Sequence, residues 1–318
     1  MKPNELATAN LQREFCGKRV LVTGGAGMIG SRLCHALVRL GSAVTVIDDL
    51  SSGFSWRLPD GLEQFITGSI VEEDVLRHGF RTQPSLVFHL AALFANQNSV
   101  DHPEQDLMVN GLGTLRVFEF AERAQVKRVV YTSSSCVSDL GAATTPYQAT
   151  KFLGEQYASQ LRGRVSIATL RLFNVYGPGD VSGLYRSVVP NMIEGALRND
   201  PLRVYGDGQD TRDYTYVDDV VRALLLGASA SKPPEKPLDI GTGRETTTLA
   251  LTNLIRAGCQ SQSAIDYQVQ RRWDTTRRRC AQVNEAQNTL GWRAQASLTD
   301  GLTATIKWHL AHNLELFA

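Results

Sequence analysis

The chain has 318 residues, of which 42% are hydrophobic and 20% are charged, and its formal net charge is +1. This is a globular composition, without the excess of charge that would favour nucleic acid or a membrane surface as the main partner. The N-terminal stretch 1–17 is polar, no apolar run is long enough to cross a bilayer, and the five cysteines are scattered without CxxC spacing. We therefore expect a cytoplasmic protein with reduced thiols and no bound metal.

Strands and helices are predicted to alternate along the first half of the chain. Apolar runs of strand length occupy 18–23, 43–48, 64–68, 85–92, 127–134 and 165–172, and helical patterns occupy 28–40, 104–124 and 147–161. Near-continuous apolar strands separated by helices are typical of a parallel sheet that is covered on both faces. The sequence therefore predicts an α/β fold.

The first predicted strand runs directly into glycines at 24, 27 and 30, which precede a predicted helix. Gly24 permits a tight turn, Gly27 lets the backbone approach a pyrophosphate, and Gly30 lets the helix pack on the strand. Asp48 ends the next strand 18 positions after Gly30 and can accept hydrogen bonds from a ribose diol. A 2′-phosphate would be repelled by Asp48 and Asp49, so the pattern favours NAD over NADP. The alternative is a glycine-rich turn without a ligand.

Tyr147 and Lys151 are four positions apart in TPYQATK and share one face of a predicted helix, shortly after the serines that end strand 127–134. A phenol with a pKa of about 10 is a poor base near neutral pH. A neighbouring ammonium and the positive nicotinamide ring both favour the phenolate and lower that pKa. We predict that Tyr147 is the general base for a substrate hydroxyl during hydride transfer. The alternative is an ordinary exposed helix face.

Seven segments occur in a fixed order, namely TGGAGMIG, VIDDLSSG, HLAA, YTSSS, YQATK, RLFNVYGPG and TRDYTYVDD. Together they resemble the extended short-chain dehydrogenase/reductase family, in particular its NAD-dependent nucleotide-sugar epimerases and dehydratases, over about residues 18–310. The resemblance implies a nucleoside diphosphate sugar as substrate, tightly held NAD, and a homodimer in which helices 104–124 and 147–161 pack against their copies.

After Asn174 the pattern becomes irregular, with frequent glycine and proline, short strands, a helix near 217–229 and the linker SKPPEKP at 231–237. We predict a Rossmann-type doubly wound parallel sheet with a smaller C-terminal α/β substrate-binding lobe. The expected parts are an N-terminal extension (1–17), an NAD-binding domain (18–175) and the substrate-binding lobe (176–318), which is partly interleaved with the NAD-binding domain.

Cofactor contacts follow from the glycine motif and the resemblance. Lys151 is implied to hydrogen-bond the nicotinamide ribose, and Ser69 stands where the family often has an aspartate that bonds adenine. His89 is expected to face the sheet interior as a structural residue. The predicted cofactor-binding residues are Gly24, Gly27, Met28, Ile29, Asp48, Asp49, Ser69, Ile70, Leu90, Ala91, Ala92, Thr132, Tyr147 and Lys151.

Substrate contacts are implied by the same resemblance. Ser134 is expected to share a hydrogen bond with the substrate hydroxyl, and Tyr205 to stack on the nucleotide base. Arginines suit bidentate binding of a diphosphate, whereas a solvated basic patch is the alternative for residues 277–279. The predicted substrate-binding residues are Ser134, Asn174, Val189, Tyr205, Arg212 and Arg277.

The predicted reaction is epimerisation at C4 of the sugar. Tyr147 removes the C4 hydroxyl proton, hydride moves to NAD, and the resulting 4-keto sugar turns before the hydride returns to its other face. The run Ser134-Ser135-Cys136 has no carboxylate, which counts against 4,6-dehydration.

Three alternatives use the same C4 oxidation with Cys136 as acid/base: 3/5-epimerisation, dehydration, and release of a keto sugar by a 4-dehydrogenase. An alternative of another class is a non-catalytic NAD-binding sensor. Only twelve residues separate Ser134 from Tyr147, fewer than is usual in the family. We therefore expect a sugar site that is more open, or that another segment fills.

Overall fold

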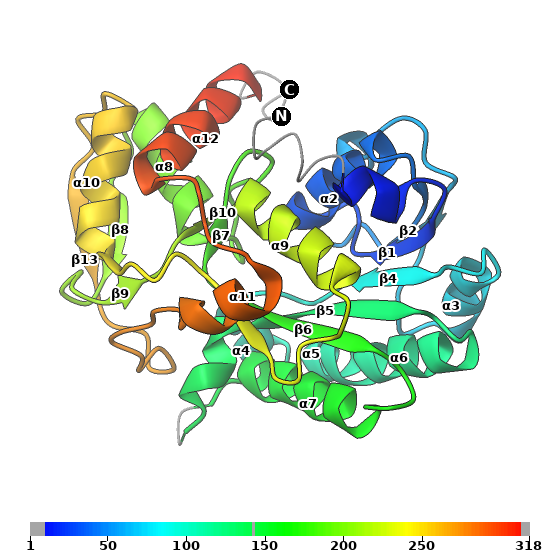
Figure 1. The fold of residues 1–318 in the computed structure, drawn as a ribbon. Coiled ribbons are helices and arrows are strands. Elements are labelled where there is room, and N and C mark those ends of the chain that lie inside the picture. Colours follow the sequence, from blue (N-terminus) through cyan, green and yellow to red (C-terminus); the bar gives the residue numbers. More distant parts are fainter. Residues whose placement is uncertain (1–9, 142–143, 313–318) are drawn as a thin grey trace.

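The computed structural model describes residues 10–141 and 144–312, and its centre is a seven-stranded sheet (Figure 1). All neighbouring strands of this sheet pair in parallel. In spatial order the strands are β11 (Leu238–Ile240), β6 (Ile167–Leu172), β5 (Arg128–Ser134), β4 (Leu86–His89), β1 (Arg19–Thr23), β2 (Ala43–Asp48) and β3 (Gln64–Thr67). The order reverses between β1 and β4, as in a doubly wound sheet, which confirms the predicted fold class.

Helices cover both faces of the sheet and explain the apolar strands. One face carries α2 (Met28–Arg39), α9 (Val217–Ser229) and α11 (Val283–Leu290). The other face carries α3 (Glu73–Phe80), α6 (Thr114–Arg123) and α7 (Pro146–Gln160). Because neither face meets water, every residue of β4 and four of the five in β1 are buried. The helix α3 was not expected from the sequence.

The predicted helix 104–124 is divided into three parts. It begins as α5 (Pro103–Asp106), widens into the π-helical η2 (Leu107–Gly113) and continues as α6. The buried Asn110 lies on the widened turn, where its amide accepts from the Leu93 N–H and donates to the Leu93 carbonyl, both at 2.9 Å. Wide π-helical turns are frequent at functional sites, and this segment ties the helix to the loop that follows β4.

A second core lies beside the sheet and forms a smaller lobe (Figure 1). It is built from α8 (Val188–Arg198), β8 (Leu202–Tyr205), α10 (Thr248–Gly258), β13 (Ile265–Gln268) and α12 (Leu298–His312). Two short pairings join β7 (Val175–Tyr176) to β10 (Thr215–Tyr216) and β9 (Thr211–Arg212) to β12 (Thr246–Thr247).

The chain crosses between the two cores more than once, since α9 and β11 pack with the large sheet. The domain boundary near residue 175 stays a prediction. No helix in 10–141 and 144–312 has the length and apolarity needed to span a bilayer. Leu107 and Phe152, on the helices expected to form a dimer, are 53% and 38% exposed, and the homodimer also stays a prediction.

Candidate active site

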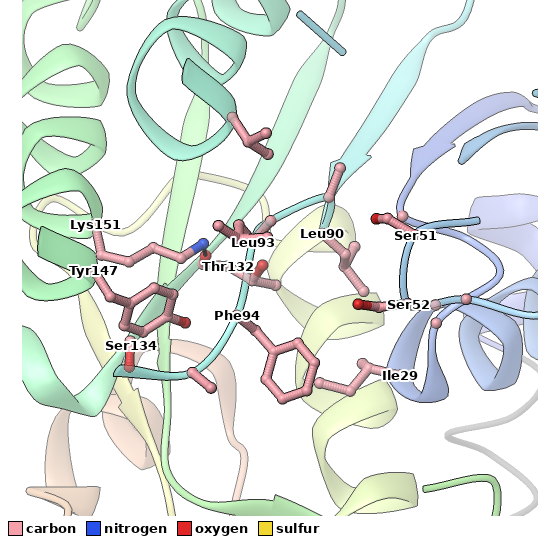
Figure 2. A pocket seen from close by; sticks show the side chains of 18 of the residues that line it. Ile29, Ser51, Ser52, Leu90, Leu93, Phe94, Thr132, Ser134, Tyr147 and Lys151 are labelled. Atoms are coloured by element: carbon pink, nitrogen blue, oxygen red, sulfur yellow. Dashed lines mark hydrogen bonds between the residues drawn. The ribbon is translucent and has the colours of Figure 1, made fainter. Parts of the chain in front are cut away.

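A cavity of about 800 Å³ opens at the carboxyl ends of β1, β2, β4, β5 and β6. In doubly wound sheets, ligands bind at this edge near the point where the strand order reverses. The cavity brings together residues far apart in the sequence, from the glycine turn after β1 to the start of α7 (Figure 2). Its lining includes the predicted residues Gly24, Gly27, Met28, Ile29, Asp48, Asp49, Ser69, Ile70, Leu90, Ala91, Ala92, Thr132, Ser134, Cys136, Tyr147, Lys151 and Asn174.

The three motif glycines have different surroundings. Gly24 has a φ of +72° and touches the chain after β4, so that an added Cβ would lie 2.6 Å from the Ala91 nitrogen. A Cβ on Gly30 would lie 2.1 Å from the Gly24 carbonyl oxygen, whereas a Cβ on Gly27 would meet only that oxygen, at 3.4 Å. Packing therefore requires glycine at 24 and 30, while Gly27 has space toward the cavity.

The start of α2 suits the pyrophosphate of a dinucleotide. Gly27 is its N-cap, makes no side-chain cap bond, and is followed by no acidic residue in the first turn. The free N–H groups and the positive end of the helix dipole therefore face the cavity and favour an anion. This end of the cavity fits NAD.

Asp48 organises the loops around this turn. One carboxylate oxygen accepts from the Ala26 N–H at 2.8 Å and the other from the Leu50 N–H at 2.9 Å. Burial raises the pKa of Asp48, and these two bonds oppose the rise. The carboxylate thus connects the glycine motif to the loop after β2, and its hydrogen bonds to a ribose stay a prediction.

At the other end of the cavity lie Tyr147, Lys151 and Ser134. Pro146 begins α7, and Thr145 and Gln148 cap it reciprocally, so that Tyr147 is fixed in the first turn of the helix. The Lys151 ammonium lies 5.8 Å from the centre of the Tyr147 ring and donates to the Thr132 carbonyl at 2.9 Å. In Figure 2 Ser134 lies beside the Tyr147 ring, and both residues line the cavity.

Without NAD, the pKa of Tyr147 is shifted upward, whereas the sequence led us to expect a downward shift. Burial raises the pKa of the Tyr147 phenol, Cys136 adds to the rise, and the Ser134 hydroxyl opposes it. Burial also lowers the pKa of Lys151 to about 8. The chain by itself therefore keeps Tyr147 protonated, because desolvation outweighs the hydrogen bond with Ser134. We still predict that the positive charge of bound NAD⁺ lowers the pKa of the Tyr147 phenol and favours the phenolate.

Cys136 lies next to the same group and is 2% exposed. Its thiol donates to the Ser134 hydroxyl over 3.1 Å, and burial raises the pKa of the thiol. The neighbouring Ser133 points elsewhere, donating to the Glu155 carboxylate at 2.6 Å. Cys136 therefore meets the cavity as a neutral thiol.

His89 is a structural residue, as expected. Its ring nitrogens lie 2.8 Å from the Thr23 hydroxyl and 3.0 Å from the Thr114 hydroxyl. Burial lowers the pKa of His89 to about 3, with a smaller contribution from Lys151. The ring is neutral and fully engaged in the sheet interior.

Four predicted substrate-binding residues do not line the cavity. Val189 is buried in the core of the small lobe, and the Tyr205 ring is covered by the Arg271 guanidinium at 3.9 Å. Arg212 pairs with Asp274 at 2.9 Å. Arg277 pairs with Asp207 at 3.0 Å and Asp210 at 2.7 Å. The substrate contacts of Val189, Tyr205, Arg212 and Arg277 stay predictions.

Two other arginines line the cavity and were not among the predicted residues. Arg279 belongs to the same basic run as Arg277. The sequence therefore pointed to the run, but it did not show which arginine of the run lines the cavity. Arg186 follows no motif that we used. Phe94 and Asn96, from the polar stretch after β4, also lie in the lining.

Comparison with known proteins agrees with this geometry. The model of the NAD dependent epimerase/dehydratase family matches residues 20–241. UDP-glucose 4-epimerase of Mycolicibacterium smegmatis is 33% identical over 308 residues, covering 91% of this chain and 98% of the relative.

Solved structures extend the likeness to the whole fold. An epimerase from Methanothermobacter thermautotrophicus has a TM-score of 0.94 at 38% identity, covering 99% of this chain and 98% of its own. UDP-glucose 4-epimerase of Thermotoga maritima, solved with UDP-glucose, has a TM-score of 0.88 at 32% identity, with 93% and 99% covered. The similar Thermus thermophilus enzyme was solved with NAD (TM-score 0.84, 28% identity, 91% and 98% covered). These likenesses argue against the non-catalytic sensor. The chain therefore belongs to the NAD dependent epimerase/dehydratase family, as an enzyme with NAD as its cofactor.

Proposed function

We propose that the protein is a 4-epimerase of nucleoside diphosphate hexoses, with UDP-hexoses as the first candidates, and that it works through a transient 4-keto sugar. The observation that carries the proposal is the meeting of Tyr147, Ser134 and Lys151 at one end of a cavity whose other end fits NAD. The UDP-glucose bound by the Thermotoga maritima enzyme supports the choice of sugar nucleotide.

Each residue has a role in moving one proton. The Tyr147 oxygen takes the proton of the C4 hydroxyl and later returns it, while the Ser134 hydroxyl bridges the two oxygens. Lys151 holds a positive charge beside the phenol and is anchored by the Thr132 carbonyl. NAD would be held by the glycine turn before α2, and when bound it would supply the hydride acceptor and donor for C4. The sugar changes configuration only if the 4-keto sugar rotates in the site, so that the hydride returns to its opposite face.

A second candidate rests on Cys136. Its thiol lies 3.1 Å from the Ser134 hydroxyl and lines the cavity, so it could donate a proton to a carbon beside the ketone. Inversion at C3 or C5 would also need a base that first removes the proton of that carbon, with Cys136 then donating a proton to the other face, so that the hydrogen there exchanges with solvent. Because burial raises the pKa of the thiol, Cys136 suits an acid better than a base.

One experiment separates these reactions. Protein with its NAD is incubated in D₂O with UDP-glucose, UDP-galactose, UDP-N-acetylglucosamine and GDP-mannose, and the products are followed by proton NMR. We expect inversion at C4 without deuterium in the sugar, and Cys136→Ala should keep most of this activity.

Deuterium at C3 or C5, lost in Cys136→Ala, would support the second candidate. A free keto sugar accompanied by a stoichiometric gain of NADH would contradict both epimerase reactions.

A further inference from the structure

Arg186 bridges the two lobes at the cofactor end of the cavity. It stands in the loop 177–187, directly before α8 in the small lobe. Its guanidinium donates to the Ser52 carbonyl at 2.9 Å and lies 5.6 Å from the centre of the Phe94 ring. Ser52 follows β2 and Phe94 follows β4, and all three residues line the cavity. The side chain therefore reaches from the small lobe to two loops of the large sheet.

The same loop also approaches the pyrophosphate end of the predicted NAD site. A Cβ placed on Gly179 would lie 3.9 Å from Cγ of Met28, the first residue of α2. In Figure 2, Phe94 extends toward Ile29, the next residue of that helix, and Ser52 lies on the same side of the view. The loop 177–187 thus reaches the N-terminus of α2, and both border the same cavity.

The local charges leave room for an anion. Within the described residues, the Arg186 guanidinium makes one hydrogen bond, although it has five N–H donors. Nearby, Arg57 is 7% exposed, and its Nε and Nη2 have no hydrogen-bond partner among the described residues. Burial lowers the pKa of Arg57 to about 10, and the charge of Arg186 contributes to this shift. Two guanidinium groups that repel each other would be stabilised by a further negative charge beside them.

Two carboxylates lie near this pair: the charge of Asp180 raises the pKa of Arg57 and of Arg186, and the charge of Asp48 raises the pKa of Arg57. Asp180 accepts from the Ser187 hydroxyl at 2.6 Å, and burial raises the pKa of Asp180 to about 6. Asp48 accepts the two backbone N–H groups described above. Neither carboxylate is hydrogen-bonded to Arg186 or Arg57 in the structure.

We propose that Arg186 binds the pyrophosphate of NAD together with the N-terminus of α2 and slows the release of the cofactor. Guanidinium groups bind diphosphates through several charge-assisted hydrogen bonds, and here one of them also joins the two lobes. The diphosphate of the sugar nucleotide has the same chemistry. We assign Arg186 to NAD because it donates to Ser52 in the loop after β2, and because Gly179 of its own loop lies next to Met28 at the start of α2. The assignment does not depend on which sugar reaction the enzyme catalyses.

The test measures NAD release from the full-length protein. Purified protein with bound NAD is diluted into an enzymatic trap that consumes free NAD⁺, and the release rate is compared between wild type, Arg186→Met and Arg186→Lys. Arg203→Met, which removes an exposed arginine from the small lobe, is the matched control. We expect release at least about tenfold faster in Arg186→Met, an intermediate rate in Arg186→Lys, and an unchanged rate in Arg203→Met.

A second measurement identifies the group that is bound. The affinities of ADP and adenosine are measured by calorimetry on the full chain freed of nucleotide. Arg186→Met should weaken ADP at least about tenfold and adenosine less than about twofold. Equal weakening of both, or an unchanged release rate, would overturn the proposal. Weaker binding of UDP to the NAD-bound variant, with ADP unaffected, would assign Arg186 to the substrate instead. Thermal unfolding shows whether Arg186→Met is folded, and Arg186→Lys carries the test if it is not.

Discussion

The cofactor end of the cavity and the small lobe differ in how well residue patterns located their side chains. Every predicted cofactor residue lines the cavity, whereas of the six predicted substrate-binding residues only Ser134 and Asn174 do. Ser134 ends β5 and Asn174 lies two residues after the end of β6, whereas the other four lie in the small lobe. The difference shows that position relative to a parallel strand was the reliable guide.

The physical reason is the shared edge of the sheet. Carboxyl ends of neighbouring parallel strands meet at one edge, so residues after β1, β2, β4 and β5 converge without any long-range detail. The small lobe has short strand pairings instead. Its arginines are flexible side chains, and they form ion pairs with whichever acids lie nearby. Arg277, for example, turns to Asp207 and Asp210.

The largest expected effect concerns the catalytic end of the cavity. Tyr147→Phe should lower kcat about a thousandfold, because it removes the acid/base group while keeping the ring. NAD content should stay within about twofold of wild type, since the remaining lining is unchanged. The check is turnover by NMR together with NAD released on denaturation. Activity within tenfold of wild type would show that another group moves the proton.

The glycine turn offers a sharper division between packing and binding. Gly27→Ala should fold normally, because its Cβ meets only one protein atom, at 3.4 Å. It should bind NAD at least about tenfold more weakly, because the added Cβ points to the space where the pyrophosphate approaches the backbone. Gly30→Ala should lower the melting temperature clearly, because its Cβ would lie 2.1 Å from the Gly24 carbonyl oxygen. Differential scanning calorimetry and NAD titration measure the two effects. If Gly27→Ala bound NAD normally, this turn would not hold the pyrophosphate.

In the small lobe, two arginines of one basic run provide the matched comparison. Arg279 lines the cavity, while the side chain of Arg277 is 61% exposed and paired with acids. Arg279→Met should therefore raise KM for the sugar nucleotide about tenfold, and Arg277→Met less than about threefold. Steady-state kinetics with the identified substrate decide the order. The reverse order would mean that Arg277 leaves its acids when substrate binds.

The smallest expected effect tests the loop that joins the two regions. Because burial raises the pKa of Asp180 to about 6, the folded chain holds a proton between about pH 4 and pH 6 that the unfolded chain has lost. The contribution of Asp180 to the free energy of unfolding therefore falls as the pH rises through this window. The groups that face it are Arg57, Arg186 and the Ser187 hydroxyl, with His309 of α12 against its backbone.

The matched variant for this test is Asp180→Asn, which cannot titrate. Its stability relative to wild type should increase by on the order of 1 kcal/mol between pH 4 and pH 7. Urea unfolding of the nucleotide-free chain at both pH values measures the difference. A difference that is independent of pH would show that Asp180 stays ionised when folded.

The sequence by itself determined the doubly wound sheet, the strand–turn–helix at the three glycines and the placement of Tyr147 with Lys151 one helical turn away. These features depend on short-range spacing and on apolar runs, which act wherever the chain goes. Only the tertiary structure decided the widened turn around Asn110, because that turn is set by hydrogen bonds to Leu93. It also decided that Arg186 and Arg279, rather than Arg212 and Arg277, face the cavity, and that burial keeps the Tyr147 phenol protonated. The reason is that desolvation and the choice of ion-pair partners depend on every element packed around a side chain, and no local pattern records them.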